Sequence, residues 1–82
     1  MYKIKNKDGT LNLCGIKIAA LRKQMRPKIS QRALADMLQL AEVDLDKNAI
    51  QRIESGKRFV TDIELKAIAK VLGVTADDLL NE

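Results

Sequence analysis

Hydrophobic residues recur along this chain at the spacing of short amphipathic helices. The first such segment covers about residues 13–25, and charged residues separate its apolar positions, which are Leu13, Ile18, Leu21 and Met25. Pro27 ends the segment, because the residue before a proline is disfavoured in the helical region. We therefore expect a first helix over about residues 13–25.

A second helix is predicted after Ser30, which is a good N-cap because its hydroxyl can accept from free amides of the first turn. The apolar face of this helix consists of Leu34, Ala35 and Leu38. Ala41 continues that face by one turn. The pattern favours a helix that runs longer than usual.

The third helix is expected over residues 47–55. Asp46 is its N-cap, and the negative charge of Asp46 suits the positive end of a helix dipole. Ile50 and Ile53 have the spacing of core residues, while the polar positions between them face outward. Gly56 ends the helix, because glycine tolerates a left-handed conformation.

Two more helices complete the pattern. Thr61 and Glu64 form a capping box that opens the fourth helix, and Gly73 closes it. Its buried stripe is Leu65, Ile68, Ala69 and Leu72. Residues 75–78 repeat the capping pattern before a last short helix that ends in two leucines. Five short helices with brief connections predict an all-α domain.

The composition fits an all-α domain and separates a polar N-terminal segment from the rest of the chain. At 82 residues the chain forms one domain, and its core must be aliphatic because Tyr2 and Phe59 are its only aromatic residues. Residues 1–12 are polar, with a turn signal at Asp8-Gly9, and are expected to form a flexible basic arm. Residues 13–82 are expected to form the domain itself.

The net charge of +4 is unevenly distributed. Residues 1–30 carry eight lysines and arginines against one acid, residues 31–58 are balanced, and residues 59–82 have an excess of three acids. A basic end of this kind can meet phosphate while the acidic end faces away. The lysines of the arm have an equally good alternative role, which is to solubilise a frayed tail.

Several functional classes are not expected. The chain has no histidine, and its single cysteine, Cys14, has no partner for catalysis or zinc binding. We therefore expect no enzyme activity, no cofactor and no metal. No apolar run approaches the roughly 20 residues of a membrane span, so no membrane is expected and a cytoplasmic location is the default.

Three motifs carry a resemblance to a known family. They are Ser30-Gln31 with Leu34-Ala35, then Ile50-x-x-Ile53-Glu54-x-Gly56, then Leu65-x-x-Ile68-Ala69-x-x-Leu72-Gly73-Val74. In this order they resemble the Cro/XRE-type, or lambda-repressor-like, helix-turn-helix domain of phage and bacterial regulators, over about residues 13–80. The resemblance implies a compact five-helix fold in which helices two and three form the helix-turn-helix.

The resemblance also implies roles for individual residues. Gln31 matches a glutamine that touches the DNA backbone or steadies a base-reading side chain. Lys47 and Asn48 match the first residues of the recognition helix, and Gln51 and Arg52 lie one turn further on. A structural ion pair is expected between two residues of the first and third helices, Arg22 and Glu54.

Two further cations follow the recognition helix. Lys57 and Arg58 lie where positive charge interacts favourably with the helix dipole, and they are equally well placed to meet phosphate. The chain departs from the family between the second and third helices. There, residues 39–46 replace a tight turn with a connection about five residues longer, which either lengthens the second helix or bulges outward.

The function expected is sequence-specific binding of double-stranded DNA by a transcriptional regulator of the repressor type, acting as a homodimer. Candidate dimer contacts are Phe59, Val74, Leu79 and Leu80, each of which also fits a core role. The alternative is an antitoxin, or another protein-interaction module of this fold, whose main partner is a protein. In that case Leu40, Val43 and Leu45 form the docking patch.

Overall fold

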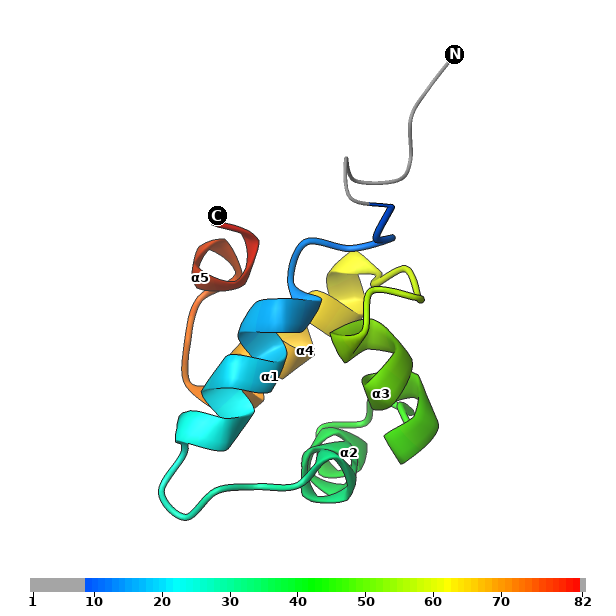
Figure 1. Cartoon of the computed structure of the whole chain (residues 1–82). Coiled ribbons are helices and arrows are strands. Elements are labelled where there is room, and N and C mark those ends of the chain that lie inside the picture. Colours follow the sequence, from blue (N-terminus) through cyan, green and yellow to red (C-terminus); the bar gives the residue numbers. More distant parts are fainter. Residues whose placement is uncertain (1–8, 82) are drawn as a thin grey trace.

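The computed structural model describes residues 9–81, which form five α-helices and no strand (Figure 1). The helices are α1 Gly15–Gln24, α2 Gln31–Leu40, α3 Lys47–Glu54, α4 Asp62–Leu72 and α5 Ala76–Leu80. This arrangement confirms the predicted all-α, five-helix class. The predicted arm lies mostly in residues 1–8, outside the described residues.

Short-range capping chemistry sets the ends of most helices. Ser30 Oγ accepts from the Ala33 amide at 3.0 Å, and an Asp46 carboxylate oxygen accepts from the Ala49 amide at 2.7 Å. Thr61 opens α4 with the predicted capping box, and Gly73 ends it with φ 75° in the left-handed region. These caps satisfy amides and carbonyls that the helices leave without a partner.

An aliphatic core lies between the helices. Among the residues described, the buried hydrophobic side chains are Cys14, Ile18, Leu34, Ala35, Leu38, Leu45, Ile50, Ile53, Ile68, Ala69 and Leu79. They come from all five helices, from the N-cap of α1 and from the α2–α3 connection, so each helix contributes its apolar side to one common core. The core positions predicted at Leu34, Ala35, Leu38, Ile50 and Ile53 are confirmed.

The long α2–α3 connection leaves the helix through a left-handed turn. Glu42 has φ 64°, and the Val43 amide donates to the Leu38 carbonyl at 2.9 Å. The chain then returns to the core at Leu45, which is 3% exposed. Ala41 lies beyond the end of α2 and is exposed, so the prediction that it continues the buried face is wrong. The turn reverses the chain before another helical turn can form.

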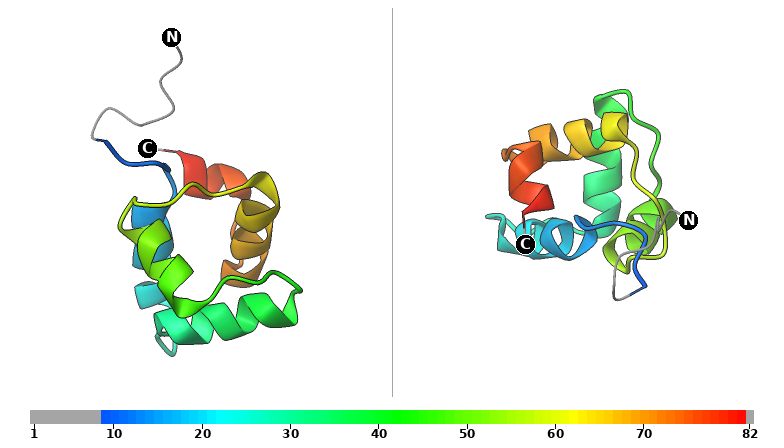
Figure 2. Two further views of the ribbon diagram at one scale, coloured as in Figure 1. Left: turned by 90° about the vertical axis from the view of Figure 1, so that its right-hand side faces the viewer. Right: turned by 90° about the horizontal axis from the view of Figure 1, so that it is seen from above.

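The helix-turn-helix lies on one side of the molecule. α3 packs against α1 and α2, and its outer face is not covered by another helix (Figure 1). α5 lies on the opposite side from α3, beyond α4 and beside the start of α1 (Figure 2). None of the helices in residues 9–81 is long and apolar enough to cross a membrane.

Candidate nucleic-acid interface

The outer face of α3 carries four polar side chains that the sequence predicted as a group. Lys47, Asn48, Gln51 and Arg52 are all exposed. On the other side of the same helix, Ile50 and Ile53 are each 1% exposed and anchor it in the core. The isoleucines lie on one face of the helix and the four polar residues on the other. Burial of the isoleucines therefore determines which side chains point away from the protein.

Chemically, this face suits a nucleic acid. Two amides can each donate and accept hydrogen bonds, and two cations can donate to guanine edges or to phosphate oxygens. The N-terminal end of α3 is held by the Asp46 cap and by the buried side chain of Leu45. The four side chains are therefore presented from a rigid base.

A buried charge network fixes the other end of α3. Arg22 Nε donates to Glu54 Oε2 at 2.8 Å, and Arg22 Nη2 donates to Glu54 Oε1 at 2.9 Å. Arg22 also donates to the Ile29 carbonyl at 3.0 Å. The hydrogen bond to Glu54 raises the pKa of the Arg22 guanidinium. The ion pair expected between α1 and α3 is present.

Gln31 joins this network rather than standing free. Its Nε2 donates to Glu54 Oε1 at 3.0 Å, and the residue is half-buried at the start of α2. The carboxylate of Glu54 therefore holds one residue from α1 and one from α2 against the last turn of α3. This contact links α2 and α3, the two helices of the helix-turn-helix, in addition to their packing in the core.

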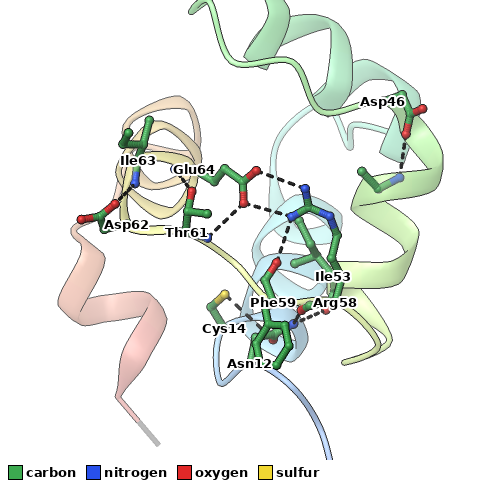
Figure 3. Close-up of polar contacts among 11 residues, drawn as sticks. Asn12, Cys14, Asp46, Ile53, Arg58, Phe59, Thr61, Asp62, Ile63 and Glu64 are labelled. Atoms are coloured by element: carbon green, nitrogen blue, oxygen red, sulfur yellow. Dashed lines mark hydrogen bonds and ion pairs between the residues drawn. The ribbon is translucent and has the colours of Figure 1, made fainter. Parts of the chain in front are cut away.

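Arg58 is held by an intramolecular ion pair, with 29% of its side chain exposed. Its Nη1 and Nη2 donate to Glu64 Oε1 at 2.9 Å and Glu64 Oε2 at 3.1 Å, and Nη1 also donates to the Phe59 carbonyl (Figure 3). The hydrogen bonds of this pair raise the pKa of Arg58 and lower that of Glu64. This geometry favours a structural role for Arg58, whereas its neighbour Lys57 is exposed.

Asn12 connects the end of α3 to the start of the domain, and the sequence reasoning did not single it out. Its Nδ2 donates to the Ile53 carbonyl at 3.0 Å and to the Arg58 carbonyl at 2.8 Å (Figure 3). Its Oδ1 accepts from the Gly15 amide at 2.8 Å. Only the last contact is local in sequence, so an asparagine shortly before a helix was the only available signal. The two contacts with residues beyond position 50 depend on the folded chain.

The predicted protein-docking patch is only partly present. Leu40 is 88% exposed, but Val43 is half-buried and Leu45 belongs to the core, so Leu45 is not part of any patch. A different apolar groove lies between the α2–α3 connection and α4. It is lined by Ala41, Val43, Ile63, Lys66, Ala67, Lys70 and Val71.

Of the four candidate dimer residues, two are buried or half-buried and two are exposed. Leu79 is 0% exposed and is a core residue, and Val74 is half-buried against the core. Phe59 and Leu80 are 48% and 41% exposed.

Cys14 is buried, and burial raises the pKa of its thiol. Within residues 9–81, no cluster of histidine, cysteine or acidic side chains could hold a metal ion.

Comparison with known proteins defines the class. The family model described as helix-turn-helix matches residues 18–79, and the chain belongs to this helix-turn-helix family. The match covers most of the region in which the sequence motifs resemble the Cro/XRE type.

A control protein and a repressor are among the proteins similar to the chain. Control protein C.MunI of a Mycoplasma species is 35% identical over 68 residues, which cover 83% of this chain and 84% of that protein. The P22 c2 repressor, solved in complex with synthetic operator 9T, superposes with a TM-score of 0.69 at 31% identity. That match covers 85% of this chain and 96% of the repressor chain. The lambda-repressor-like fold is thereby confirmed.

Proposed function

We propose that the protein regulates transcription by inserting α3 into the DNA major groove and reading base edges with the exposed face of that helix. The observation that carries this proposal is the rigidly held polar face formed by Lys47, Asn48, Gln51 and Arg52. Membership of the helix-turn-helix family supports it, as does the likeness to a repressor solved on its operator.

In this mechanism, base reading and phosphate binding belong to different residues. Asn48 and Gln51 have the amides that pair with adenine edges, and Lys47 and Arg52 can donate to guanine or to the backbone. Lys57 follows α3 and serves a flanking phosphate, which adds affinity without sequence preference. Glu54 of α3 binds Arg22 of α1 and Gln31 of α2, and these contacts keep α2 and α3 at a fixed angle.

The active species in this proposal is a homodimer on double-stranded DNA. Two copies of α3 would then read half-sites about 34 Å apart on a near-palindromic operator. The exposed apolar side chains of Phe59 and Leu80 are candidates for the dimer contact. A cytoplasmic location follows from this role, and we propose neither a catalytic activity nor a cofactor.

Selection of bound duplexes from a random pool tests the function. We expect a recurring site with two-fold symmetry, and an affinity for it that falls steeply with salt. The same affinity for every duplex in the pool would contradict sequence-specific regulation, because only contacts that distinguish bases carry specificity.

A second candidate function rests on the groove between the α2–α3 connection and α4. Its lining combines apolar residues with the paired cations Lys66 and Lys70, a chemistry that suits an amphipathic helix with an acidic edge on a partner protein, as an antitoxin would bind a toxin. Co-expression with the product of an adjacent gene tests this. A complex that survives purification and is abolished by K66E/K70E supports it, whereas a complex that is unaffected contradicts it.

A further inference from the structure

Leu11 and Asn12, which lie three to four residues before α1, hold the loop that carries Lys57 from both sides. The carbonyls immediately before and after Lys57 are those of Gly56 and Arg58. The Leu11 amide donates to the first at 2.8 Å, and Asn12 Nδ2 donates to the second at 2.8 Å. Hydrogen bonds on both sides of one residue leave its backbone little freedom. Leu11 and Asn12 therefore restrain the backbone of residues 56–58, which we call the Lys57 loop.

Asn12 is itself anchored to α1 and α3. Asn12 Nδ2 also donates to the Ile53 carbonyl in the last turn of α3, and Asn12 Oδ1 accepts from the Gly15 amide at the start of α1. A Cβ on Gly15 would lie 2.1 Å from the Ile53 carbonyl oxygen, so the two helices touch at this point. Asn12 thus fixes the loop relative to α3 rather than only relative to its own neighbours.

Lys57 is the cation of this loop that is available to a ligand. Its side chain is exposed, and the ion pairs in residues 9–81 join other residues, Arg22 with Glu54 and Arg58 with Glu64. The Lys57 amide donates to the Arg52 carbonyl at 2.8 Å, which attaches the loop directly to the recognition helix. The position of the Lys57 backbone is therefore set by α3 and Asn12 together.

We propose that Asn12 is a positioning residue for DNA binding. By ordering the Lys57 loop before DNA arrives, it places the Lys57 ammonium beside a phosphate that flanks the bases read by α3. A lysine on a loosened loop would have to lose that backbone freedom on binding, which weakens the contact. This inference rests on the proposed function, and it adds a residue that touches no base or phosphate itself.

A double-mutant cycle tests it. Affinities of the wild type, N12A, K57A and N12A/K57A for the selected duplex are measured at a temperature where circular dichroism shows all four folded. We expect N12A and K57A each to weaken binding by about five- to tenfold and to reduce the salt slope by about one. The double variant should bind no more weakly than K57A, because Asn12 acts through Lys57.

Two further variants separate positioning from stability. N12D keeps the side-chain shape and the acceptor for Gly15, but it puts a carboxylate oxygen against the Ile53 and Arg58 carbonyls and adds negative charge near the DNA, so it should weaken binding at least as much as N12A does. T75A removes the cap of α5, far from the loop, and should lower stability while leaving the affinity of the folded protein unchanged.

The outcomes are distinguishable. Additive effects in the cycle, full affinity for N12A and N12D, or full affinity for K57A would each overturn the positioning role while leaving DNA binding by α3 intact. A wild-type protein that selects no duplex would instead remove the proposed function, and the inference would fall with it.

Discussion

Arg22 of α1 and Glu54 of α3 form a bidentate ion pair, in which Nε and Oε2 lie 2.8 Å apart and Nη2 and Oε1 lie 2.9 Å apart. Their side chains are 11% and 7% exposed, so the pair is largely withdrawn from water. Removing one partner leaves the other as an uncompensated buried charge. The pair is thus a structural link between the first helix and the recognition helix.

The variant E54A should accordingly lower the free energy of unfolding by about 3–5 kcal/mol, measured by urea denaturation. D36A, at an exposed position of α2, is the matched control and should stay within about 0.5 kcal/mol of the wild type. If E54A melted within about two degrees of the wild type, the ion pair would have no structural importance.

Glu64 predicts a pH dependence of stability. The hydrogen bonds from Arg58 lower its pKa in the folded state below the ordinary value of 4.5. The unfolded chain therefore binds a proton more readily, and the stabilisation is present above that ordinary value and lost as the pH falls through the folded pKa. E64Q keeps an oxygen for the Thr61 amide but removes this charge. The gap in stability between wild type and E64Q, about 1 kcal/mol at pH 7, should close in acid. An equal gap at pH 7 and pH 3 would contradict this.

Lys57 and Arg58 are adjacent cations with opposite predictions. K57A should leave the melting temperature unchanged and lower the salt slope of DNA binding by about one, because Lys57 is exposed and contacts phosphate in our proposal. R58A should lower stability by about 1 kcal/mol, because it leaves the Glu64 carboxylate without its ion-pair partner, and it should leave the salt slope unchanged. Equal salt slopes for the two variants would show that this division of roles is wrong.

Gly15 marks the closest approach of α1 and α3. Because an added Cβ would lie 2.1 Å from the Ile53 carbonyl oxygen, which is backbone, G15A should push the helices apart. We expect a loss of about 1–3 kcal/mol, read by urea denaturation. Gly73 has open space around it, so G73A tests left-handed backbone strain alone. A G15A variant as stable as the wild type would show that the helices separate freely.

The parts of the fold that could be predicted from sequence are those set by neighbouring residues. Ser30, Asp46 and Thr61 cap their helices through bonds that span three residues, and the core face of α3 follows from the spacing of Ile50 and Ile53. The ion pair of Arg22 was reached through the family resemblance, because no local pattern connects residues 32 positions apart.

The rest depends on contacts made only in the folded chain. From sequence, Arg58 was expected to interact with the helix dipole or with phosphate, and only the fold brings Glu64 of the next helix against it. Asn12 was expected to be part of a polar arm. Leu45 read as a surface residue of an insertion, because nothing nearby in the sequence shows that the left-handed turn at Glu42 returns the chain to the core. Which exposed side chains of α3 meet bases stays a prediction.

The central claim is that the exposed face of α3 reads DNA sequence, and the most direct measurement is a specificity ratio. Affinities for the selected duplex and for a scrambled duplex are compared at one salt concentration for the wild type and for N48A and Q51A. We predict a ratio of at least about 10³ for the wild type, reduced about tenfold or more in each variant by weaker binding to the selected duplex alone. Variants that keep the wild-type ratio, or a wild type that binds both duplexes equally, would contradict the account.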